Sequence, residues 1–293
     1  MWYKKRTGSD RFFEAINLTL LFMICFIIVY PIYHLLIVSI SDGYAVLRGE
    51  VGIWPVGINF TAYRAVLQNP SIPRAYMNTV LYTTVGTTIN LVFTTLCAYP
   101  LSRKWFYGRN FFTFLIVFTM FFDAGIISNF MLVRSLGLLD SIWALVLPPA
   151  ISAWNMIIMR TFFQTQIPDE VHESATLDGA REFTIFLKII LPLSKPVLAT
   201  MTLFYAVGHW NSWFSALIYL NRSEMFPMQL IMRNIVLAGD TTAIAATVAA
   251  DMGIIARNIR YAVVFITMVP ILLVYPFVQR YFVKGIMIGS LKG

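Results

Sequence analysis

The sequence predicts an all-α polytopic membrane protein with six transmembrane helices and one cytoplasmic helix-turn-helix. Of its 293 residues, 58% are hydrophobic and only 12% are charged, and the mean hydropathy is +0.72. Such values are typical of membrane proteins rather than soluble domains. The apolar residues gather in runs of roughly 20, the length that crosses a bilayer as a helix. Residues 168–192 interrupt this pattern with a cluster of charges.

The chain begins with a short basic segment, residues 1–15, which we expect to be the cytoplasmic N-terminus. The apolar run 16–40 follows. It is too long for a signal-peptide core and no small-residue cleavage site follows it, so it predicts a first transmembrane helix. Pro31 is expected to kink that helix. Residues 41–77 are polar and contain glycine and proline, which predicts an extracytoplasmic loop.

Residues 78–283 form the predicted core of the membrane domain. Its apolar runs predict five further spans, at about 79–101, 111–133, 141–163, 196–220 and 261–283. The charged stretch 168–192 lies before the fifth span of the chain, and the long segment 221–260 forms a loop on the opposite side. The last ten residues, 284–293, form a tail. Six spans place both termini on one side of the membrane.

The distribution of Lys and Arg predicts which side this is. The larger set comprises Lys4, Lys5, Arg6, Arg11, Arg103, Lys104, Arg109, Arg160, Arg181, Lys188, Lys195, Arg280, Lys284 and Lys292. The opposite loops hold Arg48, Arg64, Arg74, Arg134, Arg222, Arg233, Arg257 and Arg260. Because basic residues are enriched in cytoplasmic loops, both termini and the stretch 168–192 are predicted to be cytoplasmic.

Local physical chemistry predicts helix, turn and helix within 168–192. Pro168 suits the first turn of a helix, and Asp169, Glu170 and Glu173 place negative charge near its N-terminus, where the helix dipole favours it. Gly179 can end that helix, and apolar residues at helical spacing then open a second one. The first helix has only a thin apolar stripe. Periodicity alone fits both a helix docked on a partner and an ordinary interfacial loop helix.

The spacing of three short motifs distinguishes these possibilities. Residues 173–175 read Glu-Ser-Ala, residues 178–180 read Asp-Gly-Ala, and residues 189–192 read Ile-Ile-Leu-Pro. This pattern resembles the EAA loop of permease subunits from binding-protein-dependent ABC importers, with a serine at 174 where the family usually has alanine. The resemblance implies the type I ABC importer permease fold. It assigns ATPase coupling to Glu173, Ser174, Ala175, Asp178, Gly179, Ala180 and Pro192, with Glu173 as a candidate ion-pair partner.

The resemblance also implies partners. A second homologous permease subunit would complete the membrane pathway, two cytoplasmic ATPase subunits would bind ATP and Mg, and an extracytoplasmic binding protein would deliver the solute. The Lys-Gly ending and the segment His-Trp-Asn-Ser-Trp at 209–213 look like the carbohydrate-uptake branch, the MalG-like and LplC-like permeases. A sugar or oligosaccharide is the expected substrate. The loop 221–260, with a possible short helix at 237–253, would dock the binding protein; a plain surface loop is the alternative.

Other functions find little support in the sequence. The three histidines, His34, His172 and His209, lie far apart and without metal-ligand spacing, and no phosphate-binding glycine loop is present, so no enzyme and no cofactor in this chain is expected. Cys25 and Cys97 lie in apolar runs and are predicted to be buried free thiols. The net charge of +8 is spread over loops without a nucleic-acid-binding pattern. The main rival is a secondary transporter driven by an ion gradient.

Polar residues within the predicted spans are candidates for lining the pathway, because each is costly in lipid unless it faces a cavity or a neighbouring helix. They are Asp123, Asn129, Asn155, His209, Trp210, Asn211 and Trp213. Aromatic rings with nearby amides suit a sugar, which stacks its C–H face and hydrogen-bonds through its hydroxyls. Helix-to-helix hydrogen bonding by Asn and interfacial anchoring by Trp are the structural alternatives. Asp123 needs a partner, which could be substrate, Arg134 or a neighbouring subunit.

Overall fold

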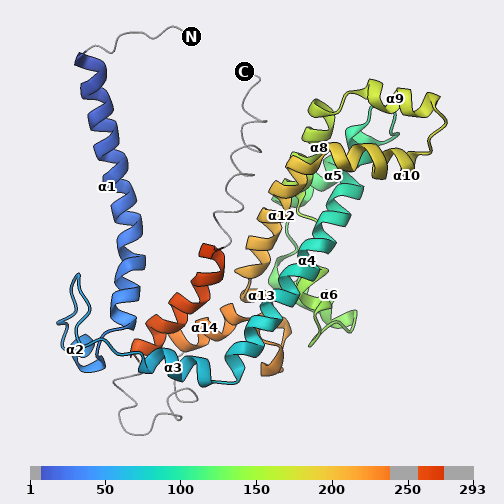
Figure 1. Cartoon of the computed structure of the whole chain (residues 1–293). Coiled ribbons are helices and arrows are strands. Elements are labelled where there is room, and N and C mark those ends of the chain that lie inside the picture. Colours follow the sequence, from blue (N-terminus) through green and yellow to red (C-terminus); the bar gives the residue numbers. More distant parts are fainter. Residues whose placement is uncertain (1–7, 238–256, 274–293) are drawn as a thin grey trace. The chain divides into compact units, whose positions relative to one another are not determined.

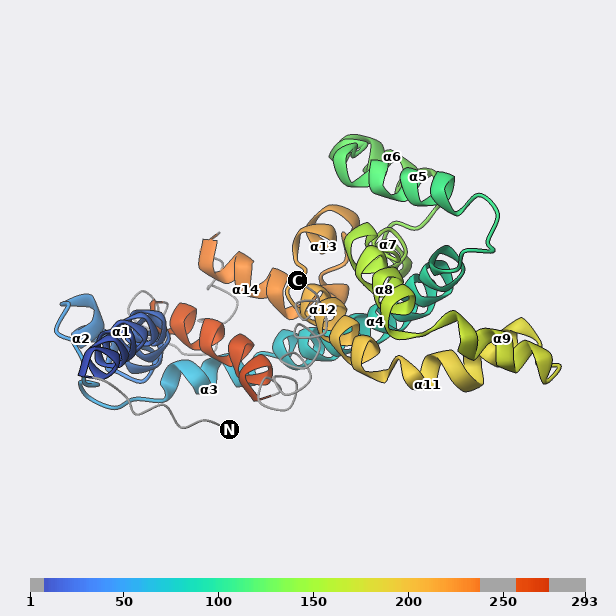
Figure 2. The same ribbon diagram turned by 90° about the horizontal axis from the view of Figure 1, so that it is seen from above.

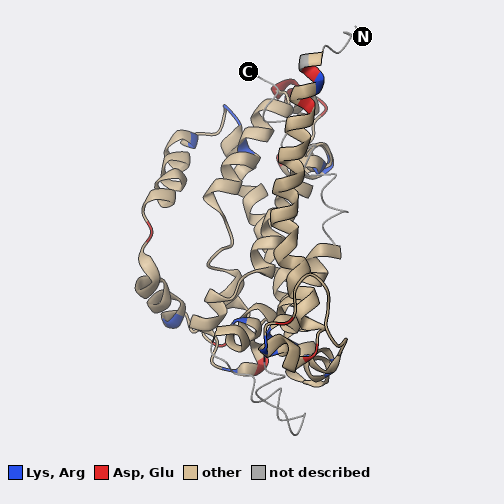
Figure 3. Cartoon of the chain, turned by 90° about the vertical axis from the view of Figure 1, so that its left-hand side faces the viewer, with Lys and Arg blue, Asp and Glu red and all other residues tan. Residues whose placement is uncertain are grey.

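A computed structural model describes residues 8–237 and 257–273, and within them every regular element is helical, which confirms the predicted all-α class (Figure 1). Charged residues lie mainly near helix ends and in loops, and the helix lengths are mostly uncharged (Figure 3). The chain divides into two compact units. Of the described residues, one unit holds 8–70, 234–237 and 257–270, and the other holds 71–233 and 271–273.

The first unit is built on α1 (Gly8–Ser39), which is exposed along most of its length and has Pro31 inside it. Two short helices follow, α2 (Gly43–Leu47) and α3 (Thr61–Gln68). The loop between them is hydrogen-bonded to the end of α1, because Tyr33 Oη donates to Ile53 O at 2.8 Å and Asn59 N donates to Ile40 O at 2.8 Å. The predicted loop 41–77 is therefore partly helical. Residues 257–273 are helical too.

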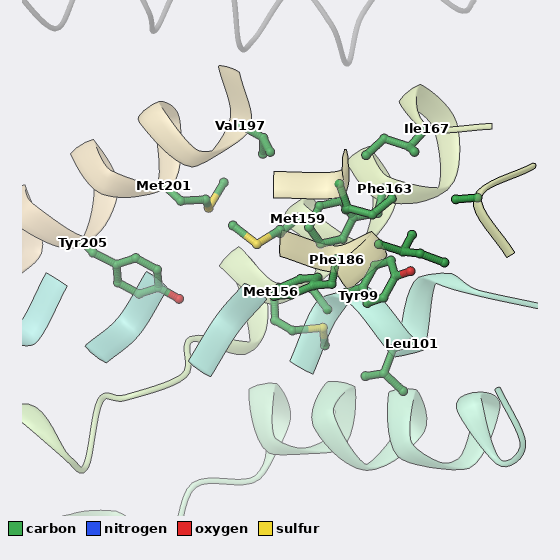
Figure 4. Close-up of a cluster of buried hydrophobic side chains, with 14 residues drawn as sticks. Tyr99, Leu101, Met156, Met159, Phe163, Ile167, Phe186, Val197, Met201 and Tyr205 are labelled. Atoms are coloured by element: carbon green, nitrogen blue, oxygen red, sulfur yellow. The ribbon is translucent and has the colours of Figure 1, made fainter. Parts of the chain in front are cut away.

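The second unit is organised around α4 (Ser71–Ser102), which packs against α8 (Ala153–Gln166) and α12 (Lys195–Trp210). Its core joins rings and thioethers from these helices (Figure 4). Phe163, Met156 and Met159 of α8 are fully buried, and the Tyr99 ring of α4 meets Phe163 edge-on with centroids 6.0 Å apart. Lipid tails are as apolar as these side chains, so van der Waals packing between the helices, rather than transfer from water, stabilises this contact. The core thus joins these three helices near the end that carries residues 168–192.

The spans predicted at 111–133 and 141–163 are broken in the structure. The first is α5 (Arg109–Phe121) and α6 (Gly125–Ser135), bent by 116°, and this pair stands to one side of α4 and α12 (Figure 2). The second is α7 (Trp143–Val146) followed by an irregular stretch and α8. That stretch contains Pro148 and Pro149, which lack the N–H donors that a continuous helix requires.

The span predicted at 196–220 is broken as well. It consists of α12, a three-residue break, and α13 (Phe214–Tyr219). By length and composition, two helices of the described part of the chain can cross a bilayer, or up to four if each sharply bent pair counts as one span. The span at 261–283 lies partly outside the described residues, and the tail 284–293 and residues 238–256 lie wholly outside them. Six spans therefore stay a prediction.

The cysteines differ in part from expectation. Both Cys25 and Cys97 are free, as predicted. Cys97 is half-buried on α4, but Cys25 is exposed on α1 rather than buried, because few residues of its own chain pack against that helix.

The segment 221–228, within the predicted external loop, is fastened to α4. It contains the short η2 (Ser223–Met225) and leads into α14 (Met228–Leu237). The amide of Asn78 donates to Glu224 O at 2.8 Å, Tyr82 Oη donates to Met225 O at 2.8 Å, and the Thr79 hydroxyl accepts from Met228 N at 2.8 Å. Hydrogen bonds to α4 therefore fix the position of the start of the predicted external loop.

Asp140 ties the loop before α7 to the end of α13. Its carboxylate accepts from Asn221 N at 2.6 Å, from the Asn221 amide at 3.0 Å and from Arg222 N at 3.2 Å. The Arg222 guanidinium donates back to Asp140 O at 2.6 Å. Asp140 is also a non-glycine residue with positive φ, at 55°, a conformation that Asp tolerates better than most residues.

We expect the hydrogen bonds that Asp140 accepts to make the stability of the fold depend on pH. The hydrogen bonds from Asn221 lower the pKa of Asp140, so its folded-state pKa lies below the unfolded one. Its contribution is present above the unfolded pKa of about 3.9 and is lost as pH falls through the folded value. The melting temperature of the purified chain should thus fall more steeply in this acidic window for wild type than for Asp140→Asn. If the melting temperatures of wild type and Asp140→Asn fall equally with pH, the pH dependence does not come from Asp140.

Candidate coupling loop and pathway residues

The stretch 168–192 forms the predicted helix, glycine turn and helix. Pro168 precedes α9 (Asp169–Leu177), whose first turn carries Asp169 and Glu170. The helix ends at Gly179, which has φ +79°, and Ala180 N then donates to Ala175 O at 3.0 Å, as in a glycine-ended helix. The second helix starts as α10 (Glu182–Ile185), and α9 and α10 lie side by side at one end of their unit (Figure 1).

The second helix is not a simple α-helix. Residues Phe186–Ile190 form a π-helical segment that leads into α11 (Leu191–Leu193), which contains Pro192. The whole segment Glu182–Leu193 then bends by 80° into α12. A π segment next to a proline is a common site of local adjustment in helices. Sequence periodicity had indicated only a regular helix here.

The motif residues divide between two faces. Ala175 is buried in the core, and Ala180 packs against the same cluster beside Ile185. The other motif residues, Glu173, Ser174, Asp178, Gly179 and Pro192, are exposed. Two large apolar side chains are exposed with them, Leu177 at 89% and Phe183 at 65%. The alanines therefore seat the loop on its own chain, and the other residues form a free face.

The structure adds an anchor that the sequence did not reveal. Arg103, which follows α4, has a side chain only 1% exposed. Its Nη1 donates to Asp169 Oδ1 at 3.1 Å and to Ile167 O at 3.3 Å, and its guanidinium lies 5.2 Å from the Tyr99 ring centroid. Counting Arg103 among loop charges predicted a solvated residue. Its place directly after an apolar run was the only signal of burial.

Two neighbours of Arg103 extend this contact. Lys104 Nζ lies 3.7 Å from Asp169 Oδ2, and the Trp105 ring lies 5.7 Å from the ring of His172 on α9. His172 Nε2 in turn lies 3.0 Å from both carboxylate oxygens of Glu182 on α10. A chain of contacts thus runs from the end of α4 through α9 to α10. The sequence carried no pattern that would have paired His172 with Glu182.

Asp123 and Asn129 meet at the break between α5 and α6. Asp123 Oδ1 accepts from Gly125 N at 3.1 Å and from the Asn129 amide at 3.3 Å. The bond to Gly125 N, two residues along the chain, forms an Asx turn just before α6. Asn129 is thus a partner of Asp123 within the chain, and it was not among the alternatives of substrate, Arg134 or a neighbouring subunit.

Asn155 is buried at the start of α8, and His209 joins two helices. Asn155 N donates to Ser152 Oγ at 3.4 Å in the N-cap of α8. His209 Nε2 lies 2.6 Å from Asn90 Oδ1 on α4, and the Asn90 amide donates to Pro149 O. His209 and Asn90 therefore link α12 to α4, and Asn90 also links α4 to the irregular stretch at Pro148 and Pro149. Asn often joins helices in this way within membranes.

The break between α12 and α13 brings a different set together. Trp210 is half-buried at the end of α12, whereas Asn211 and Trp213 are exposed in the break. Asn211 Oδ1 accepts from the Gln229 amide at 3.3 Å, and the Arg233 guanidinium lies 5.3 Å from the Trp213 ring centroid. Gln229 and Arg233 are one turn apart on α14. Sequence reasoning had left both in the external loop.

The family model described as "Binding-protein-dependent transport system inner membrane component" matches residues 9–288. The chain belongs to this family. It is similar to Protein LplC of Bacillus subtilis (strain 168), 40% identical over 98% of this chain and 97% of that protein. It is 39% identical to the polygalacturonan/rhamnogalacturonan transport system permease protein YtcP of the same organism, over 97% of this chain and all of YtcP.

A solved structure shows the same fold. It is a bacterial ABC transporter involved in the import of the acidic polysaccharide alginate, and the matching chain has a TM-score of 0.87 and 36% identity over 95% of this chain and 99% of its own length. The resemblance in residues 173–192 is thereby confirmed at the level of the whole chain. The permease is an inner membrane component of an ABC importer, and a secondary transporter driven by an ion gradient is excluded.

Proposed function

We propose that this permease forms the membrane pathway for a sugar or oligosaccharide and couples it to ATP hydrolysis by separate subunits. The observation that carries the coupling is the exposed face of the helix-turn-helix. Leu177 and Phe183 are large, apolar and exposed beside the charged Glu173 and Asp178, and apolar groups so placed mark a protein contact. Two cytoplasmic ATPase subunits, which bind ATP and Mg themselves, would cover this face. The permease itself would hold no cofactor.

The remaining partners follow from the family. A second permease chain would complete the pathway, and an extracytoplasmic binding protein would deliver substrate to the side that carries residues 221–260. Both termini and the coupling loop, residues 168–192, would then lie in the cytoplasm, in line with the unequal distribution of Lys and Arg between the two sets of loops. The exposed surfaces of α1 and the α5–α6 pair would face lipid or the second permease.

An acidic oligosaccharide is the substrate class that we propose. Relatives act on polygalacturonan or rhamnogalacturonan and on alginate by their names. In this chain, the break after α12 places the Trp213 ring, the Asn211 amide and the Arg233 guanidinium together. A ring and amides suit a pyranose, and a guanidinium binds a carboxylate. Asp123, Asn129, Asn155, His209 and Trp210 remain further candidates, although their observed contacts are mostly within the chain.

Purification of the tagged chain from its native host in mild detergent tests this function. We expect an ATPase, a second permease and an extracytoplasmic binding protein to co-purify or to reconstitute with it. Hydrolysis in proteoliposomes should rise with binding protein loaded with an oligogalacturonide, and less with a neutral oligosaccharide of equal length. An equal or larger rise with the neutral sugar would refute the acidic substrate class. Hydrolysis indifferent to the loaded binding protein would refute the importer role.

A further inference from the structure

We call Arg103 and Trp105, two residues that follow α4, the α4 anchor, because they contact the coupling helix α9 at two points. Arg103 contacts Asp169 in the first turn of α9, and Trp105 contacts His172 one turn later. Contacts at both points fix the rotation of α9 about its axis as well as its position. The covalent path from α9 to α12, in contrast, passes through Gly179, the π segment and an 80° bend.

Arg103, the buried member of the anchor, lowers the stability of the fold. Arg103 is buried at 1% side-chain exposure, and within the described residues its Nε and Nη2 atoms are buried without a hydrogen-bond partner. A buried ion pair with unmatched donors is seldom more stable than an apolar replacement of similar volume. The stability of the fold therefore does not explain why an arginine stands at position 103. The hydrogen-bonded ion pair between Arg103 and Asp169 does explain it, because it holds α9 in one position.

The position of α4 shows what such a pair could transmit. α4 packs along both α8 and α12, the helices at either end of the coupling loop. A displacement of α9 that pulls Asp169 would therefore act on Arg103 and on α4 directly, without passing through the π segment. Packed elements of this kind move as units rather than deforming continuously.

We propose that the α4 anchor is a second coupling route, in which Arg103 positions α9 and carries its movement into α4. The proposal rests on the proposed function, because it needs a partner ATPase to move α9. Arg103 is a positioning residue in this scheme. It contacts neither nucleotide nor sugar and acts through Asp169.

Arg103→Met in the assembled importer, reconstituted in proteoliposomes, tests the proposal. Methionine keeps much of the length of the side chain and leaves no buried charge. We expect hydrolysis stimulated by the loaded binding protein to stay within about twofold, while sugar taken up per ATP falls at least about tenfold, a size usual for coupling between sites. Amide hydrogen exchange in α9 should accelerate. Arg103→Lys should recover part of the ratio, because its charge can still reach Asp169.

Lys104→Met is the matched control. Its side chain is 83% exposed, and its 3.7 Å contact with Asp169 is of the kind that adds little to stability, so its uptake per ATP should equal that of wild type. If Arg103→Met fails to assemble, Trp105→Ala serves instead, because this ring is 54% exposed and its loss removes the contact with His172.

Two results would overturn the second route. One is an unchanged ratio of uptake to hydrolysis in the assembled variant. The other is a proportional fall of uptake and hydrolysis, which indicates a purely structural seat for α9. If the binding protein does not stimulate ATP hydrolysis in the wild-type complex, the proposed function is refuted, and the second route is refuted with it because it needs an ATPase that moves α9.

Discussion

Replacing Gly179 by Asp is expected to abolish uptake while expression and membrane insertion stay at the wild-type level. Gly179 lies at the exposed turn between α9 and α10 with φ +79°. A tight turn between two helices would by itself predict that a charged side chain cannot fit at this position. The structure corrects that reason, because a Cβ added at Gly179 meets no described residue within 4 Å. The loss should arise from a new charge and added bulk at the face that we propose as the contact with the ATPase.

Gly179→Asn is the control for backbone strain and size. Asn and Asp both tolerate positive φ better than other non-glycine residues, and the two side chains are nearly equal in volume. Uptake by the Asn variant should therefore exceed that of the Asp variant if charge is the cause. Uptake and hydrolysis measured in proteoliposomes decide the matter, and normal transport by Gly179→Asp would exclude this turn from the coupling contact.

Replacing Gly86 by Ala is expected to destabilise the permease by about 1–3 kcal/mol, the usual cost of overpacking a core. A Cβ at Gly86 would lie 2.5 Å from Cε1 and Nε2 of His209. The His209 ring would have to leave its place 2.6 Å from Asn90. Because Gly→Ala within a helix otherwise stabilises by roughly 0.5–1 kcal/mol, a net loss would identify the clash as the dominant effect. Thermal unfolding of the purified chain in detergent measures it.

Two further variants separate the clash from helix propensity. Gly208→Ala adds the same methyl group to a helical glycine on α12, where no described residue lies within 4 Å of the added Cβ, so it should be neutral or stabilising. Gly86→Ala combined with His209→Ala should be more stable than the sum of the single changes predicts, because the ring that clashes is gone. Additive losses would show that Gly86 and His209 do not meet.

The coupling loop could be predicted in detail because its signals are local. Pro168, the acidic first turn and Gly179 act within a few residues of themselves, and α9 ends where that pattern indicated. The interruption at Pro148 and Pro149 can be read from the sequence, but the breaks at residues 122–124 and 211–213 were not foreseen. Hydropathy over a window of about 20 residues reports transfer into lipid and is insensitive to the direction of the chain, so the 116° bend between α5 and α6 left no trace in it.

The candidate site shows the same division. Asn211 and Trp213 could be selected from the sequence, because polar and aromatic residues within an apolar run stand out. Gln229 and Arg233 could not be joined to them, since the contact depends on how α14 folds back toward the break after α12. His209 was selected for the same reason as Trp213, yet its partner turned out to be Asn90 of α4.

By itself the sequence determined the class of the protein, the positions of most apolar runs and the helix-turn-helix that carries the family motif. Composition and short-range pattern suffice for these, because transfer into lipid and helix capping are properties of single segments. Only the tertiary structure decided that Arg103 is buried and holds Asp169, a residue 66 positions along the chain. Contacts of that kind depend on packing between helices, which the periodicity of either segment does not encode.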